Sequence, residues 1–224
     1  MFICSLTIVG IYFWLGTVNL SPDSTTYMSV ANNLKNYGLL FKWVNWPSAI
    51  MLPQVEPFTD FAPGLMLLSY PFVLIFGNPL TAIMALQTLL IGFYGYVLYL
   101  LVKELFKESI IGYFFAATMF FFPLFMRIET YFWTELPFIS LTFLAIYHVI
   151  KFNSTDNKSH LLYASLIVMI ASIFKYIGVF NISLFVMLYF FRKINIKDLL
   201  KYTAVSILGI AIWFGRNFLI YGAI

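Results

Sequence analysis

Charged residues are scarce in this sequence, at 10% of its 224 residues, while hydrophobic residues make up 62%. A soluble domain carries about 25% charged residues. Low charge together with long apolar runs excludes an ordinary soluble domain and indicates an integral membrane protein. The net charge of +4 comes from basic residues in short connections rather than from a cationic stripe. Nucleic acid is therefore excluded as a partner.

Cysteine and histidine are nearly missing as well, with one cysteine and two histidines. Cys4 alone cannot form a disulfide or a Cys-based metal site within the chain. His148 lies near the cytoplasmic end of an apolar run, and His160 lies in a polar connection. Both are expected on the face away from the main group of acids, so we predict no metal site there. The sequence also lacks a glycine-rich phosphate loop and a Ser-His-Asp set, which leaves a nucleotide-sugar or hydrolase function without support.

Apolar runs long enough to cross a bilayer dominate what is present. A run of about 19 residues at 1.5 Å per residue spans a hydrocarbon core of about 30 Å. The first run has no basic region before it and no cleavage site after it, so we interpret it as a retained signal-anchor. The candidate spans cover about 2–20, 80–102, 109–126, 136–152, 161–174, 177–191 and 202–221.

The two runs on either side of Lys175 are short and could form either two helices or one. With two helices and a cytoplasmic N-terminus, eight basic residues fall inside and five outside, as the positive-inside rule prefers. One long helix would move the basic residues of 192–201 outside. We therefore predict an all-α, polytopic membrane protein with about seven transmembrane helices. Residues 1–224 form one domain, with two further interfacial helices in a long first outer loop over 21–79.

The outer loop begins and ends with helix signals. Ser21 and Pro22 suit the N-cap and the first helical position, and apolar residues then recur at helical spacing until Gly38. Asp23 shares a face with Tyr27 on this helix, with the asparagines 32, 33 and 36 opposite. The run 64–76 is too short to span and predicts a second interfacial helix. Between them, 43–57 predicts an irregular stretch.

Ionisable residues from distant parts of the chain are expected together at the outer face. At membrane depth such residues indicate function, although snorkelling helix caps are the alternative. Acids accept protons from nucleophiles, and cations hold a phosphate leaving group. Four aromatic residues suit sugar stacking or a simple interfacial belt: Trp43, Trp46, Tyr131 and Trp133. The outer acids are Asp23, Glu56, Asp60, Glu129 and Glu135, and the outer cations are Lys35, Lys42, Arg127, Lys175 and Arg216.

The order of motifs resembles the GT-C superfamily of membrane glycosyltransferases. Its branch most like this chain holds bacterial relatives of protein O-mannosyltransferases and of the lipid A aminoarabinose transferase. The motifs, in order, are SPDSTTY at 21–27, FAPG at 61–64, LIFG at 74–77, LVKELFK at 101–107, WTELPF at 133–138, KYIG at 175–178 and WFGRN at 213–217. Members continue with more helices, so the resemblance implies that this chain is an N-terminal or truncated portion.

The resemblance implies roles for individual residues. Asp23 would be the catalytic base on the acceptor, and Lys175 and Arg216 would bind the donor phosphate. Four further residues would orient or balance these charges: Glu135, Asp60, Arg127 and Glu129. The family differs in metal use, so an acidic cluster either holds a divalent cation or balances the two cations. No other cofactor is implied.

The resulting prediction is a glycosyltransferase in the plasma (inner) membrane with its active site on the outer face. It moves a sugar from a polyprenyl-phosphate donor to a lipid, glycan or protein acceptor. The alternatives are a transporter of lipid or polyprenol-linked sugar, and an inactive membrane scaffold. A transporter needs ionisable residues near the middle of the membrane, whereas here they lie at helix ends.

Overall fold

The computed structural model describes residues 20–44, 54–59, 61–107, 109–120, 122, 128 and 131–221. These residues form eight α-helices, one 3₁₀ helix and one two-stranded hairpin. In chain order the elements are α2 (Pro22–Tyr37), β1 (Phe41–Val44), β2 (Gln54–Pro57), α3 (Gly64–Phe76), α4 (Pro79–Phe106), α5 (Ser109–Phe120), α7 (Glu135–Thr155), α8 (Ser159–Phe174), η1 (Tyr176–Ile182), α9 (Ser183–Phe190) and α10 (Ile196–Tyr221).

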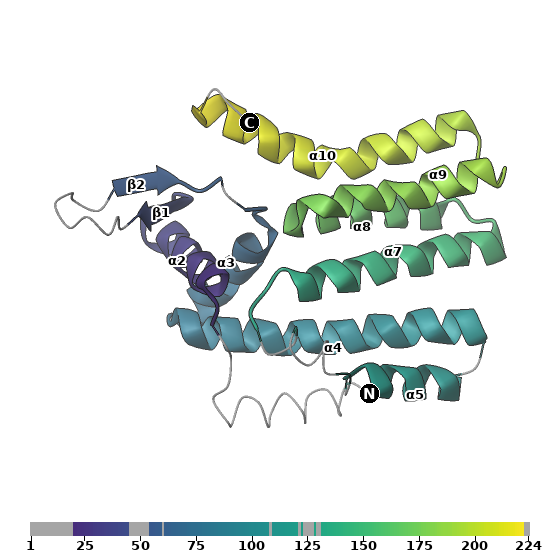
Figure 1. The fold of residues 1–224 in the computed structure, drawn as a ribbon, viewed down its shortest axis with the longest axis horizontal. Helices are drawn as coiled ribbons and strands as arrows, with labels where there is room; N and C mark the ends of the chain where they lie inside the picture. Colours follow the sequence, from purple (N-terminus) through teal and green to yellow (C-terminus); the bar gives the residue numbers. More distant parts are fainter. Residues whose placement is uncertain are drawn as a thin grey trace.

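The long helices run side by side, and α2, α3 and the hairpin gather at one end of them (Figure 1). Helix α4 packs against α5 and α7, α7 packs against α8, and α8 packs against α10. We call the end that carries α2, α3 and the hairpin the site end, and the end with the connections 107–109, 155–159 and 190–196 the opposite end. In the described residues, the connections predicted to be outside therefore lie at the site end, and those predicted to be inside lie at the opposite end. Which side of the membrane each end faces stays a prediction.

The predicted number of spans is wrong for the described part of the chain. Three helices there are long and apolar enough to cross a membrane: Pro79–Phe106, Glu135–Thr155 and Ile196–Ile220. Helix α8 has 16 residues, about 24 Å at 1.5 Å per residue, which is shorter than a hydrocarbon core of about 30 Å. The predicted span 177–191 consists of the 7-residue 3₁₀ helix η1 followed directly by the 8-residue α9, and the combined helix Tyr176–Phe190 is too short to be counted as a span. The predicted span 2–20 lies almost wholly outside the described residues.

The chain reverses at Lys175, as the two-helix interpretation requires. Lys175 has an extended backbone, with φ −143° and ψ 132°, so α8 ends at Phe174. Phe185 and Leu188 of α9 are then buried in one cluster with Leu161 and Val168 of α8. A single helix through Lys175 is therefore excluded.

Helix α2 begins and ends where the sequence predicts. The Ser21 side chain accepts a hydrogen bond from the Ser24 amide, and Ser24 returns the contact in a capping box. Gly38 ends the helix with a φ of +69°, a conformation that glycine adopts without strain. One expectation is wrong: Asn33 is buried rather than solvent-facing, because its amide donates to the Phe41 carbonyl oxygen at 3.0 Å.

A β-hairpin occupies the stretch predicted to be irregular. Strands β1 and β2 pair antiparallel, with Phe41 opposite Pro57 and Lys42 opposite Glu56. The Phe58 amide extends the pairing by donating to Leu40. The prediction failed because four-residue strands give little periodicity, and their pairing depends on contacts across a long loop.

Two close backbone contacts bring the small elements against the bundle. A Cβ at Gly64 would lie 2.8 Å from the Ile173 carbonyl oxygen, and one at Gly178 would lie 2.7 Å from the Ser172 nitrogen. Only glycine permits such approaches. The start of α3 and the turn after Lys175 therefore both press on the end of α8.

Candidate active site

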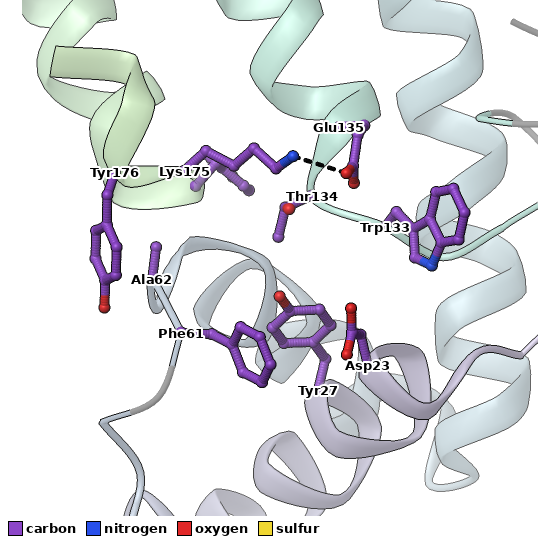
Figure 2. A pocket seen from close by; sticks show the side chains of 10 residues that line it. Asp23, Tyr27, Phe61, Ala62, Trp133, Thr134, Glu135, Lys175 and Tyr176 are labelled. Atoms are coloured by element: carbon purple, nitrogen blue, oxygen red, sulfur yellow. Dashed lines mark hydrogen bonds and ion pairs between the residues drawn. The ribbon is translucent and has the colours of Figure 1, made fainter. Parts of the chain in front are cut away.

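A pocket of about 380 Å³ opens at the site end, between α2 and the ends of α7 and α8. Its walls come from four parts of the chain that are far apart in sequence (Figure 2). The lining residues are Asp23, Tyr27, Phe61, Ala62, Trp133, Thr134, Glu135, Phe174, Lys175 and Tyr176. Three of the charged residues predicted from the sequence meet here, Asp23, Glu135 and Lys175, together with the predicted aromatic residue Trp133.

Asp23 is solvent-exposed in the first turn of α2, on the lower wall of the pocket in Figure 2. Hydrogen bonds join this turn to the segment before α7. The Ser24 hydroxyl donates to the Phe132 carbonyl oxygen at 2.9 Å, and the Trp133 indole donates to the Ser21 hydroxyl at 2.7 Å. These contacts fix Asp23 relative to Trp133 across more than a hundred residues of sequence.

Glu135 and Lys175 form an ion pair on the upper wall of the pocket (Figure 2), with 2.7 Å between Nζ and Oε1. Their side chains are 32% and 34% exposed, respectively. Glu135 opens α7 and Lys175 follows α8, so each charge complements the dipole of its helix terminus. The pair is thus held in place and still open to a ligand from the pocket.

Tyr27 forms the floor beside Asp23. Its ring is buried and packs edge-on against Phe61, with 5.6 Å between ring centroids. Burial, followed by the Asp23 carboxylate, raises the pKa of the Tyr27 phenol above its usual value. The phenol is therefore neutral at physiological pH and retains a proton to donate. Sequence periodicity had placed Tyr27 on the face of Asp23, but it gave the side chain no role.

Arg216 lies at the site end but outside the pocket lining. Its guanidinium donates to the Phe58 carbonyl oxygen at 2.7 Å and to Asn217 at 2.9 Å. It also stacks over Trp213, 4.7 Å from the ring centroid, and Trp213 donates to the Tyr176 hydroxyl at 3.1 Å. Arg216 is thus linked to the pocket wall through Trp213 and Tyr176, a network that the sequence did not reveal.

Three of the other predicted site residues cannot be placed, and one further acid of the predicted outer face is paired elsewhere. Asp60, Arg127 and Glu129 lie outside the described residues. Glu56 pairs with Lys42 across the hairpin at 3.6 Å. The pocket lining has two carboxylates, Asp23 and Glu135, and no group of three or more His, Cys, Asp or Glu within the described residues could hold a metal ion.

His148 and His160 are closer than the sequence suggested. Their Nδ1 atoms lie 3.0 Å apart, because α7 and α8 are joined by a short turn at the opposite end. This distance fits a hydrogen bond between one neutral ring and the protonated nitrogen of the other. The pair is distant from the pocket and has no third ligand among the described residues.

The family of dolichyl-phosphate-mannose-protein mannosyltransferases matches residues 60–215. The match covers more than half of the chain and includes α3, α4, α7 and α8, with Glu135 and Lys175. Comparisons with curated proteins and with solved structures gave no match. The chain belongs to this family of GT-C membrane glycosyltransferases, which confirms the resemblance.

Proposed function

We propose that the pocket between α2, α7 and α8 is the transfer site of a glycosyltransferase that uses a polyprenyl-phosphate sugar. Family membership implies a glycosyltransferase with such a donor and an acceptor. The single observation that carries the assignment to this pocket is that Asp23 and Lys175 line it together. A base and a phosphate-binding cation are the two groups that the reaction needs.

The proposed reaction is a direct displacement at the anomeric carbon. Asp23 takes a proton from an acceptor hydroxyl or amine, which forms the new bond to that carbon. The bond from the anomeric carbon to the phosphate oxygen breaks, and its electron pair stays on the lipid phosphate. Charge develops on that oxygen, so a preorganised cation nearby lowers the barrier.

Lys175 is the better placed of the two predicted phosphate ligands. It lines the pocket, and its pair with Glu135 orients the ammonium without enclosing it. Arg216 is engaged with Phe58 and Trp213, so its proposed role is to position Tyr176 and to add positive potential. Glu135 then balances Lys175 before the donor arrives.

The proposed orientation has the site end on the outer face of the plasma membrane and the N-terminus in the cytoplasm. It rests on the positive-inside rule, and many of the described basic residues lie at the opposite end, among them Lys107, Lys151, Lys158, Arg192 and Lys193. The donor would then reach the pocket from the outer leaflet, and the acceptor would be a lipid, a glycan or a protein.

Asp23→Asn tests the proposal directly. Purified protein is given a polyprenyl-phosphate sugar and acceptor, and the released lipid phosphate is measured. Removal of the base should lower turnover by about 10²- to 10⁴-fold, while binding of the donor persists because Lys175 is intact. Glu56→Gln is the matched control, since Glu56 is an acid at the same end that lies outside the pocket lining. Equal turnover in Asp23→Asn and wild type would overturn the assignment of Asp23.

A further inference from the structure

A second pocket, of about 620 Å³, lies at the opposite end of the molecule. It is formed where α8 begins and where the chain turns from α9 into α10. Its lining combines basic side chains with aromatic ones: Lys158, Tyr189, Phe190, Arg192, Lys193, Ile194, Asn195 and Asp198. The proposed transfer reaction uses none of these residues.

The charge of this pocket is positive. Lys158, Arg192 and Lys193 face a single carboxylate, Asp198, which lies 2.7 Å from the Lys158 ammonium. That contact raises the pKa of Lys158 above its usual value, so the lysine stays charged at neutral pH. Arg192 and Lys193 have no ion pair among the described residues. The pocket therefore retains excess positive charge suited to an anion.

The turn that carries Arg192 is held in one conformation. The Arg192 amide donates to Tyr189 and the Lys193 amide donates to Leu188, which are the two bonds of a Schellman motif. Arg192 takes the left-handed position of this motif, with a φ of +55°, where glycine would be unstrained. A cation thus occupies, at the pocket edge, the backbone position that glycine usually takes after a helix.

A buried apolar residue anchors the turn, and exposed aromatic residues lie next to it. Ile194 is buried with Phe185 and Tyr202, which ties the turn to the bundle. Phe190 and Phe191 are 75% and 70% exposed immediately beside the cations. Helix α10, which begins at Ile196, is long and apolar enough to span a membrane, so we expect these phenyl rings near the level where acyl chains meet headgroups.

We infer that this pocket binds the phosphate headgroup of an anionic phospholipid, with the acyl chains against Phe190 and Phe191. Basic residues just outside a span attract anionic lipids of the adjacent leaflet, and here they line a formed pocket. Lys158, Arg192 and Lys193 supply the donors for the phosphate oxygens. Lipid bound at this site would hold this end of the helix bundle at its leaflet, and this binding would not depend on the sugar donor.

The test compares lipid binding in the full chain and in the double variant Arg192→Gln and Lys193→Gln. Protein in detergent is titrated with phosphatidylglycerol or phosphatidylcholine, and the bound lipid is counted by native mass spectrometry. Wild type should prefer phosphatidylglycerol, and the double variant should lose that preference by at least about tenfold. Glutamine keeps the backbone strain at position 192 comparable, because it also has a Cβ.

The control variant is Lys35→Gln with Lys42→Gln, which removes the same charge at the site end. It should keep the preference for phosphatidylglycerol. An equal loss in both variants would show non-specific attraction and overturn the inference, as would competition by millimolar inorganic phosphate alone. Asp23→Asn should bind phosphatidylglycerol as wild type does, so failure of the transfer proposal and failure of this one give different results.

Discussion

Both ends of this molecule concentrate charged side chains, and the ion pairs around Glu135 and around Glu104 differ in what they do. At the site end, Glu135 and Lys175 are 40 residues apart in sequence and meet at the wall of a pocket that also contains Asp23. At the opposite end, Glu104 binds Lys107 one turn away and Lys151 on the neighbouring helix at 2.6 Å. The first arrangement leaves its charges open to a ligand, whereas the second joins α4 to α7. Charge alone therefore does not identify the proposed transfer site.

The helix caps differ between the ends as well. At the site end, the left-handed residues after α2 and α3 are Gly38 and Gly77. At the opposite end, the left-handed positions are occupied by the charged residues Lys107, Asp156 and Arg192. Glycine is unstrained in this conformation, and a side chain costs about 1–2 kcal/mol. The charged residues at the opposite end thus take a backbone conformation that costs them more than it costs glycine.

We expect the largest contrast in turnover and in stability between a charge-removing substitution at the site end and one at the opposite end. Lys175→Gln should lower sugar transfer by about 10²-fold or more, because the developing phosphate charge loses its cation. The free energy of unfolding should change by less than about 1 kcal/mol, since the Glu135–Lys175 pair is partly exposed. Turnover with a polyprenyl-phosphate sugar and thermal unfolding in detergent are the two measurements.

Glu104→Gln is the counterpart at the opposite end and should give the reverse pattern. Glu104 is buried between two lysines, so loss of its charge should lower the free energy of unfolding by about 1–3 kcal/mol. Turnover per folded molecule should stay near that of wild type. If Lys175→Gln lost stability and kept turnover, the contrast between the ends would be wrong.

A second prediction concerns the close backbone contacts that position Lys175. Gly178→Ala would bring a Cβ to 2.7 Å from the Ser172 nitrogen and to 2.8 Å from Ala171 backbone atoms. Backbone atoms cannot move away as the end of a flexible side chain can, so we expect the free energy of unfolding to fall by about 1–3 kcal/mol. Turnover should fall as well, because these contacts position Lys175. Gly215→Ala is the control, because its Cβ would meet nothing within 4 Å, and alanine in a helix is favoured by about 1 kcal/mol. Equal unfolding temperatures for the two variants would contradict the packing argument.

We expect the smallest effects from two substitutions after helix ends, one that removes a left-handed glycine at the site end and one that introduces a glycine at the opposite end. Gly38→Ala should lower the free energy of unfolding by about 1 kcal/mol, because its φ is +69° and no neighbouring atom opposes the methyl group. Arg192→Gly should raise it by a similar amount. Chemical or thermal unfolding of the two single variants and the double variant measures this, and the double variant should be close to wild type. A loss of stability in Arg192→Gly would show that the arginine side chain stabilises the turn.

Local sequence signals predicted much of the helical fold. Ser21, Pro22 and Gly38 set the bounds of α2, and the apolar run 64–76 matches α3. The hairpin was missed because its pairing joins segments across a loop, and the buried role of Asn33 depends on that pairing. Within the described residues, fewer helices are long enough to span a membrane than the sequence predicted, because an apolar run indicates burial or membrane contact without fixing the length of one helix.

Sequence also grouped the charges of the candidate site, but only to one end of the molecule. Asp23, Glu135 and Lys175 line the pocket, whereas Arg216 lies behind Trp213. A prediction of transmembrane spans places each residue at a depth in the membrane, but it does not say beside which other helix the residue lies. The contacts of Trp133 with Ser21 and of Trp213 with Tyr176 decide that position.

By itself, the sequence determined that this is a helical membrane protein of the GT-C type whose charges are separated toward two ends. Those properties follow from composition, from the spacing of apolar runs and from the order of short motifs, all of which are local. Tertiary structure alone decided which charges share a pocket, where the chain turns beside Lys175, and that Arg192 takes a strained position. Each of these depends on contacts between residues distant in sequence, or on a backbone angle that no residue type imposes.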